Sequence, residues 1–318
     1  MTRAPARHAT PREDQATRLR ELVARLDRAR DARPQPARAS AGPADTAPVR
    51  SAHVIAIASG KGGVGKSNIA VNLCAALARQ NVRVILFDGD DGLANADVLC
   101  GLHPRRRTTD EPDAWPPSLV EAPGGFRLAP GDSAGLAQRP GRLAQRLALV
   151  NRLASTEIGV EALVIDCGAG LGERVLAFTR AADRALIVST PEPTALADAY
   201  ALIKRLRTDT SSCGEAPGSI QLVVNQASEE SDARRAHARL DAVSRRFLGE
   251  GVDLAGWIPL DPVVAECVRA QRPWVVARPR ADASRAVRRL ASGLADGFRA
   301  PARRRHARWR RWFGLRGR

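Results

Sequence analysis

A glycine-rich octapeptide, GKGGVGKS from Gly60 to Ser67, carries the clearest chemical signature in the chain. It fits the pattern G-x-x-x-x-G-K-[ST], in which backbone N–H groups surround phosphate oxygens and the N-terminus of the following helix adds a positive dipole end. Two of the three lysines in the chain, Lys61 and Lys66, lie in this octapeptide, although Lys and Arg together number 50. Such an arginine-rich background indicates that a compact ammonium group is required at both positions.

The octapeptide predicts a site for ATP or ADP with Mg²⁺. Lys66 should contact the β- and γ-phosphates and serve catalysis, and the Ser67 hydroxyl should bind Mg²⁺. The alternative is a glycine-rich turn without a ligand, which a strand before the loop and a helix after it disfavour. The expected nucleotide-binding residues of the loop are Gly60, Lys61, Gly62, Gly63, Val64, Gly65, Lys66, Ser67 and Asn68.

Two aspartates end apolar segments of the strand type, Asp88 in VRVILFD and Asp166 in ALVID. Carboxylate oxygens are ligands that Mg²⁺ prefers in nucleotide sites. We therefore predict a metal site formed by Ser67, Asp88 and Asp166, in which Asp166 acts through water. The alternative for Asp166 is a polar strand end that caps the next helix.

Apolar segments that alternate with helical patterns predict the elements that position these residues. Apolar strands interleaved with helices are typical of a parallel sheet covered on both faces. The predicted fold class is α/β, with a doubly wound and mainly parallel sheet in a single P-loop NTPase domain. The proline-rich interval 103–125 has no period and is predicted to be a surface excursion. The expected strands are HVIAIAS, VRVILFD, EALVIDC, RALIVST, SIQLVVNQ and DLAGWIP.

Composition divides the chain into four parts, 1–32, 33–50, 51–302 and 303–318. The first part fits an amphipathic helix that begins with a capping-box pattern, and the second is a linker rich in Pro, Ala and Ser. The third part is the globular domain, and the fourth is a basic, aromatic and amphipathic tail. The apolar faces of the two extensions would consist of Leu19, Leu22, Val23 and Leu26 in the first part and Trp309, Trp312 and Phe313 in the last.

The net charge of +16 is concentrated at the two ends of the chain. Residues 1–50 contain 11 Arg against 6 acidic residues, and residues 303–318 contain 8 Arg and no acid, which leaves +3 for the part between. No apolar run approaches the roughly 20 residues of a membrane-spanning helix, and the start of the chain lacks a signal-peptide core. We therefore expect a cytoplasmic protein. The five scattered cysteines contain no CxxC pair and suggest neither disulfides nor a zinc or iron–sulfur site.

The second lysine of the loop, Lys61, is typical of the deviant Walker A motif, and with it the sequence resembles the MinD/ParA family of ATPases. The resemblance implies that Lys61 reaches the phosphates of ATP bound to the partner in a nucleotide-sandwich homodimer and serves catalysis there. An exposed loop charge is the alternative. The resemblance also implies that Asp90 positions or deprotonates the attacking water and that Asn225 contacts the adenine edge, with Pro259 nearby. Gly89 stands where the family usually has alanine.

Three further segments resemble the flagellar regulators of this family, the FlhG or FleN group: GLANADVLCGL, DCGAGLGERVLAF and TPEPTALADAYALIKRL. The resemblance implies a slow ATPase switch that dimerises on ATP, binds the anionic inner membrane through residues 303–318 near a cell pole, and regulates flagellum number and placement. DQATRLREL at 14–22 is similar to the element by which this group stimulates the GTPase FlhF, so residues 11–30 are the expected site for an FlhF-like GTPase. Further implied partners are flagellar switch or C-ring proteins and, in some relatives, a flagellar transcriptional activator.

A DNA-binding protein and an electron-transferring enzyme are the two alternative function classes. A ParA-type DNA-binding partition protein would use a basic face on the globular domain, which carries only +3. An electron-transferring reductase would need paired cysteine ligands, which Cys74, Cys100 and Cys167 do not supply. The N-terminal helix could instead fold back on its own domain, and the tail could be a basic segment that binds nucleic acid without specificity.

Overall fold

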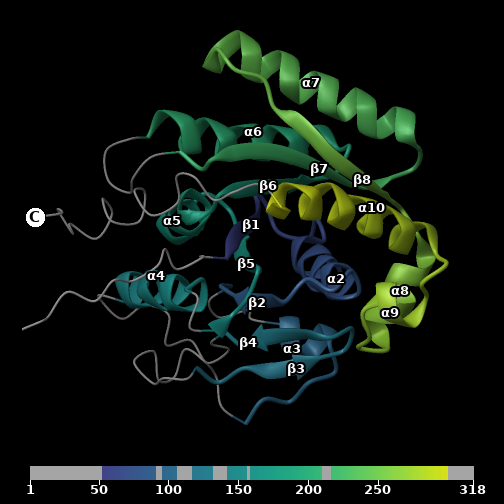
Figure 1. The fold of residues 1–318 in the computed structure, drawn as a ribbon. Coiled ribbons are helices and arrows are strands. Elements are labelled where there is room, and N and C mark those ends of the chain that lie inside the picture. The colour runs from purple at the N-terminus through teal and green to yellow at the C-terminus, as the bar shows by residue number, and fades with distance from the viewer. Residues whose placement is uncertain are drawn as a thin grey trace, which may run out of the picture. The chain divides into compact units, whose positions relative to one another are not determined.

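The structure is a computed structural model that describes residues 52–90, 95–105, 117–131, 142–155, 158–209 and 216–299 (Figure 1). The predicted N-terminal helix, the linker and the basic tail lie outside the described residues, and these three predictions stay open. No helix of the described part combines the length and the apolar character needed to cross a bilayer.

One sheet organises the described residues, and the strand pairs within it are parallel except for β3 with β4. This arrangement confirms the predicted α/β class with a mainly parallel sheet. The six strands expected from apolar segments are all present, although β2 begins two residues later than the segment that predicted it. The strand order is β3 (Val120–Ala122), β4 (Phe126–Ala129), β2 (Val84–Asp88), β5 (Ala162–Ala169), β1 (His53–Ser59), β6 (Arg184–Ser189), β7 (Ser219–Ala227) and β8 (Asp253–Pro259).

Helices cover both faces of the sheet, which is why its central strands are apolar throughout. In β1, Ile55 and Ile57 belong to one core, whereas Val54 and Ala56 belong to the other, as alternation along a strand requires. One layer contains α2 (Lys66–Ala78), α3 (Ala96–Leu99), α8 (Pro262–Arg269), α9 (Trp274–Ala277) and α10 (Asp282–Asp296). The other contains α4 (Arg142–Leu153), α5 (Glu173–Ala181), α6 (Pro193–Thr208) and α7 (Glu230–Leu248).

The prediction of a surface excursion over 103–125 is wrong for its last residues, because β3 pairs with β4 in an antiparallel hairpin. The hairpin turns at Gly124 and Gly125, whose φ angles are +103° and +87°. A Cβ at Gly124 would lie 2.7 Å from the Cβ of Ala75 on α2, so the turn also packs closely against that helix. A three-residue strand at a sheet edge leaves too short a pattern to recognise in advance.

The connections bring the predicted site residues to one edge of the sheet. β1 lies between β5 and β6, and the chain leaves β1 toward β2 but later returns to form β6 on the other side. In parallel α/β sheets, ligands bind outside the carboxyl ends of strands at such a reversal of strand order. The phosphate-binding loop, Asp88 and Asp166 all follow or end strands at this edge.

Candidate nucleotide-binding site

The glycine-rich loop joins β1 to α2, as the sequence predicts. Gly65 precedes α2 with φ 86°, and a Cβ there would lie 2.3 Å from Nδ2 of Asn225. A Cβ at Gly60 would lie 2.1 Å from the carbonyl oxygen of Asp198 on α6. These close approaches require glycine, and they hold the loop between β7 and α6 with its backbone at the N-terminus of α2.

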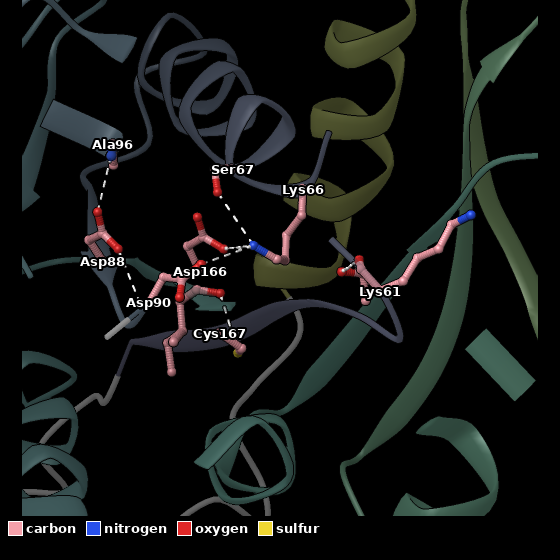
Figure 2. Close-up of polar contacts among 10 residues, drawn as sticks. Lys61, Lys66, Ser67, Asp88, Asp90, Ala96, Asp166 and Cys167 are labelled. Carbon is pink, nitrogen blue, oxygen red and sulfur yellow. Dashed lines mark hydrogen bonds and ion pairs between the residues drawn. The ribbon is translucent and has the colours of Figure 1, made fainter. Parts of the chain in front are cut away.

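Asp88, Asp90 and Asp166 lie at or just after the carboxyl ends of β2 and β5 and are called the acidic edge below. Lys66 lies among these carboxylates (Figure 2). Its Nζ donates a hydrogen bond to Asp166 Oδ1 at 3.1 Å, lies 3.4 Å from the Ser67 hydroxyl and is 3.7 Å from Asp90 Oδ2. Burial alone would lower the pKa of this ammonium, but the carboxylates of Asp166 and Asp90 outweigh burial and raise the pKa above its ordinary value. Lys66 is therefore a fixed positive charge, available to phosphate oxygens.

Asp166 has an oxygen that fits a Mg²⁺ site. The residue is 1% exposed, and its buried Oδ2 has no hydrogen-bond partner, whereas Oδ1 accepts from Lys66. A buried carboxylate oxygen without a donor is costly unless a water or a cation meets it. No group of three or more His, Cys, Asp or Glu side chains in the described residues could hold a metal without other ligands. Mg²⁺ is usually held by one or two protein oxygens, substrate phosphates and water, so the unpartnered Oδ2 of Asp166 fits such a site.

Asp88 is tied to the backbone around it. Its Oδ2 accepts from the Ala96 N–H at 3.0 Å and its Oδ1 from the Asp90 N–H at 3.2 Å. Burial, and next the nearby charge of Asp166, raise the pKa of Asp88 to about 7. The structure thus shows Asp88 holding the segment that carries Asp90, and its predicted role in the metal site stays a prediction.

Asp90 lies within the site because two glycines make room for its backbone and side chain. The Gly89 N–H donates to the Asp166 carbonyl at 2.8 Å, and a Cβ at Gly89 would lie 2.7 Å from that oxygen and 3.2 Å from the Phe178 ring. An alanine here would therefore not fit without a shift of the neighbouring backbone. A Cβ at Gly168 would lie 3.1 Å from Asp90 Oδ1. The arrangement brings Asp90 beside Lys66, and its role in positioning the attacking water stays a prediction.

Lys61 is directed away from Lys66 (Figure 2). Its Nζ donates to Glu192 Oε2 at 3.0 Å and to the Thr194 hydroxyl at 3.1 Å, at the start of α6. The Lys61 side chain is 31% exposed. The ammonium is thus held at the surface, outside the cluster around Lys66 in its own chain.

Asn225 lies at the carboxyl end of β7, where its Nδ2 donates to the Val64 carbonyl oxygen at 2.8 Å. It therefore supports the phosphate-binding loop directly. Next to it, Gln226 has a positive φ of 58°, and Pro259 at the end of β8 pairs with Ala227. The adenine contacts of Asn225 and Pro259 stay predictions.

Sequence reasoning missed several residues that the structure brings to this edge. Glu192 and Thr194 occur in TPEPT, a segment whose only signal in the sequence is its family resemblance. Phe178 and the buried Arg146 had no local signal, because each reaches the site through packing between elements. Contacts between segments far apart in the chain do not appear in a local pattern.

The loop on β1, the buried lysine and the carboxylates at neighbouring strand ends define a P-loop nucleotide hydrolase. Residues 50–295 match the family model described as ParA: NUBPL iron-transfer P-loop NTPase. The chain is 38% identical over 252 residues to antiactivator FleN of Pseudomonas aeruginosa, which covers 78% of this chain and 88% of that protein. The chain belongs to the FlhG/FleN group of the MinD/ParA family of P-loop ATPases.

Two further comparisons agree with this membership. The chain is 34% identical over 194 residues to the flagellum site-determining protein YlxH of Helicobacter pylori, which covers 60% of this chain and 64% of that protein. Its fold is similar to that of a chain in the MinC:MinD cell division protein complex of Aquifex aeolicus, with a TM-score of 0.62 and 26% identity, and the match covers 80% of this chain and 99% of that chain.

Proposed function

We propose that the chain is an ATP-dependent molecular switch that forms a sandwich homodimer with ATP and returns to a monomer after slow hydrolysis. The observation that supports it most directly is the position of Lys61, whose ammonium lies on the outer side of the loop, on Glu192, and not at its own phosphate site. A cation presented outward at the edge of a nucleotide site can serve a site on a second chain. Membership in the MinD/ParA family supports the same interpretation.

In this proposal each residue of the site has one task. Lys66 binds the β- and γ-phosphates, and Lys61 of the partner neutralises charge that develops on the transferred group. Asp90 accepts a hydrogen bond from the attacking water and orients it. Ser67 and Asp166 hold Mg²⁺, Asp166 through water, and the bound ion supplies neutralisation of phosphate charge.

The proposed output is control of flagellum number and placement. The support is membership in the FlhG/FleN group and the name of the Helicobacter relative, a flagellum site-determining protein. The proposed partners are an FlhF-like GTPase on residues 11–30, flagellar switch or C-ring proteins and, as in some relatives, a flagellar transcriptional activator. The dimer would bind anionic inner membrane peripherally, near a cell pole, through residues 303–318.

Removal of residues 303–318 is expected to eliminate binding to vesicles that contain anionic lipid, while ATP turnover stays within about twofold of the full chain. Arginines would meet lipid headgroups while aromatic side chains insert at the boundary with the acyl chains, so binding needs both. Vesicle co-sedimentation with ATP and Mg²⁺ measures this. As the matched control, simultaneous replacement of Trp309, Trp312 and Phe313 by alanine keeps all 8 arginines of the tail and should still weaken binding strongly. Full binding by that triple variant would reduce the tail to a polybasic segment.

A peptide of residues 1–40 is expected to raise GTP turnover by the FlhF-like GTPase of the same organism. The predicted helix is too short and too charged to be stable alone, so it would order on its partner, with Asp14 and Gln15 near the GTPase site and Leu22 on the docked face. GTP hydrolysis by the dimeric, GTP-loaded partner measures the effect, which tests the flagellar part of the proposal.

Two variants of the full chain sharpen that experiment. Gln15→Ala and Leu22→Asp should each remove the stimulation and leave ATP turnover by the P-loop domain unchanged, because neither residue belongs to that domain. If the peptide does not change GTP turnover by a partner that is shown to be dimeric and loaded with GTP, the proposed link to FlhF is wrong. The proposal would then be reduced to a MinD-like ATPase.

A further inference from the structure

Arg146 on α4 is a buried arginine next to the site that the proposed function does not yet use. The residue is 3% exposed, and its Cζ lies 5.7 Å from the centroid of the Phe87 ring, within the range of a cation–π interaction. Phe87 directly precedes Asp88 in β2. A charge buried to this degree persists only where opposite charges or hydrogen bonds compensate for lost hydration. The acidic edge beyond Phe87 is therefore part of what stabilises Arg146 in the interior.

The charges around Arg146 agree with this placement. Burial and the neighbouring Arg174 guanidinium lower the pKa of Arg146 to about 10, and the carboxylates of Asp88 and Asp90 oppose that decrease. Burial also lowers the pKa of Arg174 on α5, and the charge of Asp90 opposes that decrease. With a pKa of about 10, Arg146 remains charged at neutral pH. Cations therefore approach the acids from both helical layers, Lys66 from α2 and the two arginines from α4 and α5.

An aromatic pair connects this layer to the backbone that carries Asp90. The rings of Phe87 and Phe178 meet edge to face, with centroids 5.8 Å apart and an interplanar angle of 77°. Phe178 also closes the space beside Gly89, where a Cβ would lie 3.2 Å from its ring. On the side of Gly89 away from Phe178, the Gly89 N–H donates a hydrogen bond to the Asp166 carbonyl oxygen. The backbone just before Asp90 is thus confined between β5 and the aromatic pair.

We propose that Arg146 is a positioning residue of the switch: through the Phe87 ring and the charge of Asp90, it holds the Asp90 carboxylate in the place that hydrolysis requires. This inference rests on the proposed ATPase switch, because the position of Asp90 matters only where water is activated at this edge. Arg146 acts through these residues and needs no contact with the nucleotide. The consequence is that α4, which contributes nothing to the phosphate-binding loop, controls turnover.

The test compares three variants of the full chain. Arg146→Met removes the charge at similar length, Arg146→Lys keeps it, and Arg152→Met is the control on the same helix. In Arg146→Met, kcat for ATP should fall at least about tenfold while KM changes less than about threefold, because the phosphate-binding loop is intact. Arg146→Lys should recover part of the loss, and Arg152→Met should stay within about twofold of the unaltered chain.

A second readout uses the chain without nucleotide or metal. Hydrogen exchange at the amides of Gly89, Asp90 and Ala96 should become at least about fivefold faster in Arg146→Met, while amides in α2 keep their rates. Unchanged exchange and unchanged kcat in a folded Arg146→Met variant would overturn the proposal, and so would equal acceleration across the whole domain.

The two readouts also separate this inference from the proposed function. If Arg146→Met does not fold, the Arg146→Lys variant tests the proposal. A positioning role predicts that this variant has a reduced kcat and faster hydrogen exchange only at the amides of Gly89, Asp90 and Ala96. An Arg146→Lys variant identical to the unaltered chain in both would then count against the proposal. Absence of ATP turnover in the unaltered chain would contradict the ATPase, whereas the exchange comparison would still decide whether Arg146 holds the switch segment.

Discussion

Lys66→Ala is expected to abolish ATP binding, with an affinity at least about a hundredfold lower than that of the unaltered chain. The ammonium is buried beside Asp166 and Asp90, at the point where the loop would place the β- and γ-phosphates. Hydrogen bonds to charged groups contribute about 1.5–3 kcal/mol each, so losing contacts to two phosphates costs about 3 kcal/mol or more. Titration with a fluorescent ATP analogue in the presence of Mg²⁺ measures the loss.

The same substitution should also destabilise the chain without nucleotide, and this effect must be separated from lost binding. Asp166 would keep a buried charge with neither oxygen bonded to a cation, and breaking a buried ion pair costs about 3–5 kcal/mol. The double variant Lys66→Ala/Asp166→Asn should therefore regain much of the thermal stability and still fail to bind ATP. Lys204→Ala, which changes the third lysine of the chain at an exposed position of α6, is the matched control. Micromolar ATP binding by a folded Lys66→Ala variant would contradict the assignment of the site.

The sheet could be predicted from the sequence because its central strands are apolar on both faces. The segment HVIAIAS in β1 became a central strand with the predicted bounds, and DLAGWIP did so in β8 at the edge of the sheet. The β3–β4 hairpin could not be predicted in the same way, because β3 has three residues and its turn depends on contact between Gly124 and α2. Its only local signal was the Gly-Gly pair before Phe126.

Much of the candidate site could also be predicted, since the loop motif and the aspartates after apolar strands lie at the carboxyl edge by topology. What could not be predicted depends on contacts between distant segments. The partner of Lys61, Glu192, lies 131 residues away. Arg146 cannot be told from the many surface arginines of this chain by residue type, and it is buried through contacts between distant segments, among them the Phe87 ring on β2. The backbone bonds of Asp88 likewise depend on how the chain folds after β2.

Lys61→Ala is expected to remove ATP-dependent dimerisation and to lower hydrolysis by about a thousandfold or more, to background. A cation that reaches a transferring phosphoryl group from a second chain contributes about 10³–10⁵ in rate in related arrangements. Affinity for ADP in the monomer should stay within about twofold, because Lys61 lies outside the cluster around Lys66. Stability should hardly change, since its ion pair with Glu192 is exposed and such pairs contribute about 0–1 kcal/mol.

Dimerisation is best measured in a background that hydrolyses slowly, so that the ATP-bound dimer persists. Asp90→Ala should bind ATP and accumulate as a dimer, because the attacking water loses its positioning group. Lys61→Ala combined with Asp90→Ala should bind ATP and remain a monomer in analytical ultracentrifugation. Glu192→Ala removes the partner of Lys61 in the monomer and keeps the lysine, so this control should still dimerise.

Mixing two inactive variants tests whether Lys61 acts on the partner's nucleotide. A Lys61→Ala chain keeps an intact binding site, and a Lys66→Ala chain keeps an intact Lys61. If Lys61 acts across the dimer, a mixture contains one complete site, formed by Lys66 of the first chain and Lys61 of the second, and should recover measurable hydrolysis. If Lys61 acts only within its own chain, no mixture contains a complete site. Normal dimerisation and hydrolysis by Lys61→Ala alone would exclude both roles and reduce this lysine to an exposed loop charge held by Glu192.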